Sequence, residues 1–140
     1  MIFNPNSTGD APELAERLRA ELAARVPGIP VTMAPTEHAG HARDLARAAA
    51  ATGRPLLISV SGDGGYNEVV DGAMAAGNEE MVCAVMAAGN ANDHRRSTRG
   101  QSLPDAILGG RVRRIDLLRL TIGSGSNAHS RYAPPTSGSA

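Results

Sequence analysis

The stretch of sequence from residue 56 to residue 68, LLISVSGDGGYNE, carries the clearest structural signal in the chain. Its first five residues are nearly all apolar, which is typical of a strand buried on both faces of a parallel sheet. A glycine-rich turn at residues 61–65 follows directly, and a helix is predicted at residues 66–76. Because glycines let the backbone turn sharply and expose amides that attract phosphate oxygens, this stretch predicts a phosphate-binding turn.

Short apolar runs alternate with helical patterns on both sides of this stretch, which is typical of parallel β–α–β units. We predict strands at residues 1–3, 29–33, 56–60, 81–86 and 112–121, and helices at residues 12–26, 39–52, 66–76 and 103–108. The last strand mixes arginines with apolar residues, so it should lie at an edge or face water on one side. The pattern predicts a Rossmann-like three-layer α/β/α domain with a mainly parallel sheet over residues 1–121. The Ser/Gly/Pro-rich tail at residues 122–140 is expected to be disordered.

The composition excludes several kinds of chemistry. Fourteen basic and fourteen acidic residues cancel, so no bulk field attracts nucleic acid. All the basic residues are arginine, which excludes a Walker-type phosphate lysine and a Schiff-base lysine. The single cysteine, Cys83, lies in an apolar run and is expected to be a core residue. No transmembrane stretch or signal peptide is visible, so we expect a cytoplasmic protein.

Two more polar loops accompany the glycine-rich turn. Residues 4–9 follow the first predicted strand, and residues 88–93 follow the fourth. Loops that follow parallel strands share the carboxyl edge of a sheet, so all three should meet at one ligand-binding crevice. In this setting Asp63 suits a Mg²⁺ ligand or a general base, or it simply caps the helix. His38 and His41 are interpreted as a solvated helix start rather than a metal site.

In order and spacing, these loops resemble the motifs of the catalytic domain of diacylglycerol kinases and their relatives, the sphingosine kinases and bacterial lipid kinases. The family pattern Asn-Pro-x-Ser-Gly resembles the sequence NPNSTG at residues 4–9. The family pattern Gly-Gly-Asp-Gly-Thr-x-Asn-Glu resembles SGDGGYNE at residues 61–68, and Pro-x-Gly-Thr-x-Asn-Asp resembles AAGNAND at residues 87–93. Thr36 resembles a family threonine near the nucleotide.

The resemblance implies an ATP-dependent lipid kinase that uses Mg²⁺, transfers the γ-phosphate to a lipid hydroxyl and acts in phospholipid biosynthesis. The ATP-binding residues that it implies are Asn4, Pro5, Asn6, Ser7, Thr8, Thr36, Ser61, Gly62, Asp63, Gly64, Gly65, Tyr66, Asn67 and Asn90. Asp63 is the implied catalytic carboxylate and a candidate metal ligand, and the supporting residues are Glu68, Asn92 and Asp93. Relatives differ in which acidic residue accepts the proton, so the general base stays open.

The chain departs from the family pattern at several positions. Gly65 and Asn90 stand where the family has threonine, and Ala87 stands where it has proline. The family's β-rich C-terminal domain is absent from these residues, so we expect a fragment with weak or no activity alone. The alternatives are a non-catalytic nucleotide-binding module and a polar-substrate kinase of the NAD-kinase type. The expected partners are a nucleotide and a lipid, with peripheral membrane contact and oligomer formation left open.

Overall fold

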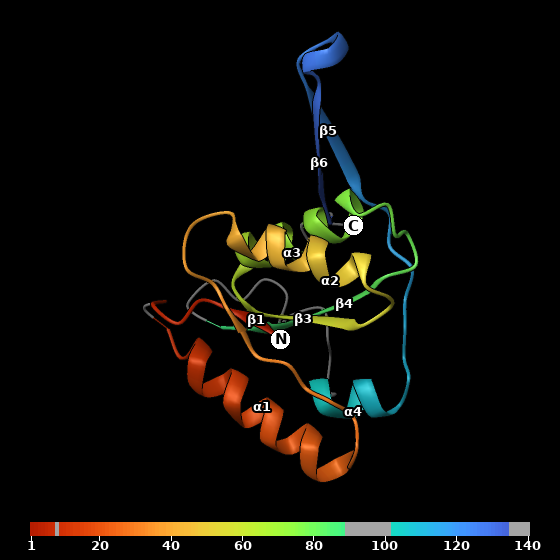
Figure 1. The fold of residues 1–140 in the computed structure, drawn as a ribbon. Helices are drawn as coiled ribbons and strands as arrows, with labels where there is room; N and C mark the ends of the chain where they lie inside the picture. The colour runs from red at the N-terminus through yellow and green to blue at the C-terminus, as the bar shows by residue number, and fades with distance from the viewer. Residues whose placement is uncertain (8, 89–101, 135–140) are drawn as a thin grey trace, which may run out of the picture.

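The computed structural model of the chain describes residues 1–7, 9–88 and 102–134 (Figure 1). Its helices and strands, in chain order, are β1 (Ile2–Phe3), α1 (Ala11–Arg25), β2 (Ala34–Pro35), α2 (His41–Ala51), β3 (Leu56–Ser61), α3 (Asp63–Ala75), β4 (Val82–Ala87), α4 (Leu103–Leu108), β5 (Leu118–Ile122), a 3₁₀ turn η2 (Gly125–Asn127) and β6 (His129–Ala133). No helix in the described ranges combines the length and the apolar character needed to cross a bilayer.

Four parallel strands form the main sheet in the order β2–β1–β3–β4. The central strand β3 pairs with the short β1 on one side, where Ile2 lies opposite Ser59. On its other side β3 pairs with β4 along all six of its residues. Helices cover both faces of this sheet (Figure 1), so the predicted three-layer α/β/α architecture with a parallel sheet is confirmed.

The two faces of the main sheet pack against different helices. The side chains of β3 alternate between the two faces and so enter two separate cores. Leu57 packs in the core shared with α2 and α3. Ile58 and Val60 pack in the core shared with α1, and the side chains of α4 contact that second core. Much of the helical contribution is alanine, which lets helices lie close to the sheet and to one another. At the closest point, a Cβ on Gly72 of α3 would lie 2.1 Å from the backbone oxygen of Arg43 in α2.

The second strand differs from the prediction. Residues 29–33 form no strand, and β2 comprises Ala34 and Pro35 instead. β1 offers only two residues for pairing, Ile2 with Ala34 and Phe3 with Pro35. The apolar residues before β2 serve a different purpose, since Val31 packs against the core beneath α1. Val31 and Met33 of this run are thus partly buried against the core, whereas Ile29 is exposed.

Within residues 112–134, the predicted strand bounds and the predicted disorder of the tail are both wrong. β5 begins at Leu118, six residues later than predicted, and it pairs with β6 in a separate antiparallel hairpin rather than with the main sheet. Residues 122–134 are thus structured, and the hairpin projects beyond the α2/α3 layer (Figure 1). The prediction that β5 faces water holds, because Leu118 is 66% exposed. Residues 135–140 lie outside the described ranges.

Candidate functional site

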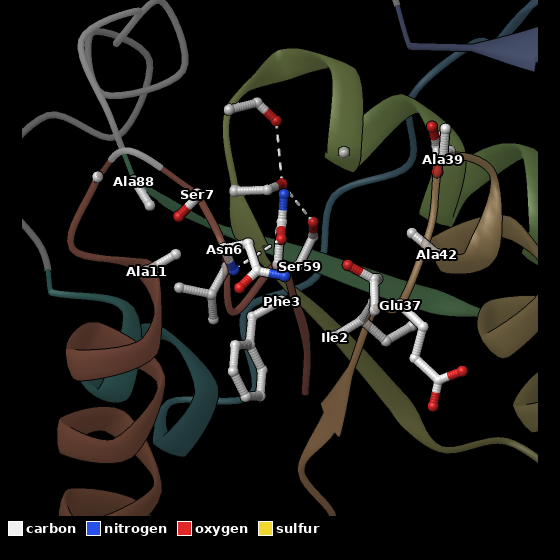
Figure 2. A pocket seen from close by; sticks show the side chains of 18 of the residues that line it. Ile2, Phe3, Asn6, Ser7, Ala11, Glu37, Ala39, Ala42, Ser59 and Ala88 are labelled. Atoms are coloured by element: carbon white, nitrogen blue, oxygen red, sulfur yellow. Dashed lines mark hydrogen bonds between the residues drawn. The ribbon is translucent and has the colours of Figure 1, made fainter.

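A cavity of about 560 Å³ opens at the carboxyl edge of the main sheet (Figure 2). It is bounded by the loop after β1, the segment after β2, the junction of β3 with α3, and Ala88 after β4. The predicted site residues that line it are Asn4, Asn6, Ser7, Thr36, Ser61, Gly62, Gly65 and Glu68. Parallel strand order therefore brings the first two predicted loops to one site, as expected.

Hydrogen bonds fix the loop after β1 at the cavity. The side-chain oxygen of Asn4 accepts the backbone N–H of Asn6 at 2.9 Å, and the Asn4 backbone oxygen accepts the N–H of Ser7 at 3.3 Å. The N–H of Thr36 donates to the Phe3 oxygen at 2.8 Å, which ties the segment after β2 to β1. The Ser7 hydroxyl is buried and has no hydrogen-bond partner among the described residues (Figure 2). A buried polar atom without a partner is costly, so Ser7 is suited to bind a polar ligand atom.

The glycine-rich stretch is more compact than the predicted five-residue turn. Ser61 ends β3, Gly62 alone connects it to α3, and the helix already begins at Asp63. The N–H of Tyr66 makes the first helical bond, to the Gly62 oxygen at 3.2 Å. The amides of residues 63–65 thus belong to the first turn of α3, at the positive end of the helix dipole. Such an amino end attracts anions, and phosphate in particular.

Several predicted site residues do not line this cavity. Pro5, Asp63, Gly64 and Asn67 are close in sequence to its lining but are not part of it. Tyr66 is buried and lines a separate cavity of about 820 Å³, bounded by α3, β4, α4 and residues 110–117. Burial, and to a smaller extent the charge of nearby Cys83, raises the pKa of the Tyr66 hydroxyl. The remaining predicted residues, Thr8, Asn90, Asn92 and Asp93, lie outside the described ranges.

The positive potential at the cavity comes from the backbone. Among the described residues that line it there is no arginine, whereas Glu37 and Glu68 are acidic. Three helices begin at the cavity wall, as the lining positions of Ala11, Ala42 and Gly62 show. Over residues 1–7, 9–88 and 102–134, no group of three or more His, Cys, Asp or Glu side chains is arranged to hold a metal ion. An anion at this site would therefore be attracted by helix amino ends.

Sequence reasoning missed Ser59 as a site residue. Its side chain is 1% exposed, lines the cavity, and lies 2.6 Å from the Ser61 hydroxyl, oxygen to oxygen (Figure 2). The available signal was a polar residue within an apolar strand, two positions before Ser61. His38 also lines the cavity, and its ring stacks on that of His41 with a centroid distance of 4.7 Å.

Residues 1–120 match the model of the family described as the diacylglycerol kinase catalytic domain. The chain belongs to this family. The match includes every polar loop described above and extends over most of the 140 residues. The match supports phosphotransferase activity at a coarse level, because the family is kinase-related. Kinase domains in general use ATP. No curated protein and no solved structure matches the chain.

Proposed function

We infer that the chain binds ATP with its phosphates at the amino end of α3 and transfers the γ-phosphate to a lipid hydroxyl. The observation that carries this proposal is the cavity at the carboxyl edge of the sheet, lined by Asn4, Ser7, Thr36, Ser61 and Gly65, in a chain of a kinase-related family. Its lipid acceptor would bring the protein into peripheral contact with a membrane surface.

Backbone amides would provide most of the phosphate binding. A chain without lysine has no Walker-type ammonium group to offer. The first turn of α3 instead supplies N–H donors and the positive end of a helix dipole. Ser7 and Ser61 add hydroxyl groups that line the same cavity. Hydrogen bonds to a charged phosphate are stronger than those between neutral groups, so a few such donors suffice for useful affinity.

The residues present fit the magnesium site of a nucleotide-dependent enzyme. Mg²⁺ usually keeps several waters and is bound by one or two carboxylates together with substrate phosphates. Glu68 lines the cavity, and Asp63 directly follows Gly62, which also lines it. The Glu68 carboxylate, which lines the cavity, would hold the ion beside the phosphates, where it would neutralise charge that develops during transfer. No cage of three or more acidic side chains is needed for this mode of binding.

Asp63 is the proposed proton acceptor. In the transfer, the oxygen of the lipid hydroxyl forms a bond to the γ-phosphorus while the bond to the β–γ bridging oxygen breaks and ADP leaves. The hydroxyl proton passes to the Asp63 carboxylate, which is half-buried at the start of α3. Phosphoryl transfer depends largely on positioning, and the fixed helix start provides it for this carboxylate.

The replacement Asp63→Asn tests this proposal. We expect phosphorylation of diacylglycerol in mixed micelles, measured with γ-labelled ATP, to fall at least a hundredfold, while ATP binding survives. Because slow turnover is expected of these residues alone, the assay uses high protein concentration and long incubation. Asp116→Asn, at an exposed position outside the cavity, is the matched control and should retain activity.

Three outcomes would contradict the proposal. A wild-type chain that binds no ATP would rule out the nucleotide site. A chain that binds ATP but transfers no phosphate to diacylglycerol, sphingosine or NAD would be a binding module. Preferential phosphorylation of NAD would make it a polar-substrate kinase.

A further inference from the structure

Two serine hydroxyls meet on the face of β3 that is turned toward α3. Ser59 and Ser61 are two residues apart, so their side chains lie on the same face of the strand. Their hydroxyl oxygens are 2.6 Å apart, and both residues line the cavity. Ser59 is buried, whereas Ser61 is partly exposed at the end of the strand. The pair therefore reaches from the core of the domain to the amino end of α3.

Gly65 provides the space that the Ser61 side chain occupies. A Cβ on Gly65 would lie 2.6 Å from the Ser61 hydroxyl oxygen and 2.7 Å from the Ser61 Cβ. Gly65 lies in the first turn of α3, where any residue can adopt the backbone conformation. Glycine is thus needed at position 65 because it has no side chain, and not because of its backbone conformation. Side chains at positions 61 and 65 exclude each other.

Counting protons gives the direction of the hydrogen bonds. The Ser61 hydroxyl donates its single proton to the Gly62 oxygen at 3.0 Å. The Ser59 hydroxyl must then donate to the Ser61 oxygen, because a hydroxyl has only one proton to give. The Gly62 oxygen also accepts the N–H of Tyr66. It therefore keeps a partner if the Ser61 proton rotates toward a ligand, and the rotation leaves no buried group unpaired.

On the basis of the nucleotide site proposed above, we propose that Ser61 donates its hydroxyl to a phosphate oxygen of ATP. Ser59 acts as a positioning residue that holds the Ser61 oxygen and polarises its O–H group. The family pattern has threonine at the position of Gly65. In this chain the hydroxyl comes from Ser61, at the end of β3, instead. Gly65 makes room for that side chain, so the site keeps one hydroxyl although the threonine is absent.

Comparing ATP with adenosine tests the role of Ser61. NMR titrations of the 140-residue chain would give the Kd of each ligand for the wild type and for Ser61→Ala. We expect Ser61→Ala to weaken ATP binding about tenfold and to leave adenosine binding unchanged, since the lost bond is to a charged phosphate. Ser126→Ala, in the exposed hairpin turn, is the matched control and should change neither Kd. Unchanged ATP affinity in Ser61→Ala, or equal losses for both ligands, would overturn the proposal.

A double-mutant cycle tests whether Ser59 acts through Ser61. Ser59→Ala should weaken ATP binding about threefold in the wild-type background. It should have no effect on ATP binding in the Ser61→Ala background, because its target is gone. Additive losses would show that Ser59 affects the fold in general and would overturn the positioning role.

Exchanging the two side chains tests their mutual exclusion. Gly65→Thr alone should reduce ATP affinity more than Ser61→Ala does, because the threonine collides with Ser61. Combining it with Ser61→Gly should restore affinity to within about threefold of the wild type, since the pair again carries one hydroxyl. Circular dichroism of each variant would show whether it is folded. Lack of rescue in a folded double variant would refute the exchange.

Different results would refute the nucleotide site and the role of Ser61. A wild type that binds no ATP refutes the nucleotide site itself. If the wild type binds ATP, but no more tightly than Ser61→Ala does, only the role of Ser61 is refuted.

Discussion

Asp71 on α3 accepts the backbone N–H of Tyr132 on β6 at 2.8 Å through Oδ1. Its Oδ2 accepts a hydrogen bond from Nε of Arg43 on α2 at 2.6 Å. Asp71 is only 4% exposed. One buried carboxylate therefore holds the C-terminal hairpin against α3 and joins α3 to α2. The helix that starts at the candidate site is thus anchored on both sides.

Replacing Asp71 tests this anchor. Asp71→Ala leaves Arg43 and the Tyr132 N–H without their shared partner, and should lower the free energy of unfolding by about 3 kcal/mol. Asp71→Asn keeps an oxygen for Tyr132 and should cost less. Urea unfolding measures both variants, and exposed Asp116→Ala should stay within about 0.5 kcal/mol of the wild type. If Asp71→Ala also stays within that range, the anchor contributes little.

Gly72 marks the closest approach of α2 and α3. Its Cβ would lie 2.1 Å from the Arg43 oxygen and 2.9 Å from the Ala46 Cβ. Gly72→Ala should therefore force the helices apart and cost at least about 2 kcal/mol of unfolding free energy. Gly64→Ala, on the same helix with nothing within 4 Å of its Cβ, should instead stabilise by about 0.5–1 kcal/mol. Equal midpoints of denaturation for the two variants would contradict this packing.

Cys83 should make stability depend on pH under alkaline conditions. Burial raises the pKa of its thiol to about 11. The unfolded thiol loses its proton near its ordinary pKa of about 8.5, so above that pH the unfolded chain binds fewer protons than the folded one. The free energy of unfolding should then fall as pH rises from about 8.5 toward about 11. Urea unfolding between pH 8 and about 9 measures this, below the ordinary tyrosine pKa of about 10, and Cys83→Ala should flatten the slope. An equally steep slope in that variant would assign the effect to another group.

Much of the fold follows from the sequence because its decisive signals are local. The apolar run at residues 56–60 followed by glycines predicts a buried strand that ends at a helix, and β3 and α3 meet at Gly62. Parallel connections then place the loops after β1 and β2 beside that junction, which is why Asn4 and Thr36 share a cavity with Ser61. The family match over residues 1–120 agrees with the motif spacing.

The parts that could not be predicted depend on tertiary pairing. Residues 29–33 have the composition of a strand, but the pairing of β1 with β2 begins only at Ala34. The Ser/Gly-rich segment looked disordered, yet residues 123–128 connect β5 to β6, and the Thr121 and Ser130 hydroxyls lie 3.0 Å apart across the hairpin. In the sequence, Ser59 lies within an apolar run. Only its contact with Ser61, which lies beside Gly65, shows that Ser59 belongs to the site.

The most direct test of the account is an NMR map of where ATP binds. We predict that ATP with Mg²⁺ shifts the amide signals of residues 61–65 and of Ser7 and Thr36, and that Met74 and Ile107 at the second cavity stay unchanged. Adenosine should leave the signals of residues 61–65 in place, because it has no phosphate for the amino end of α3. Shifts confined to the second cavity, or no shifts at millimolar ATP, would contradict a phosphate site at the junction of β3 and α3.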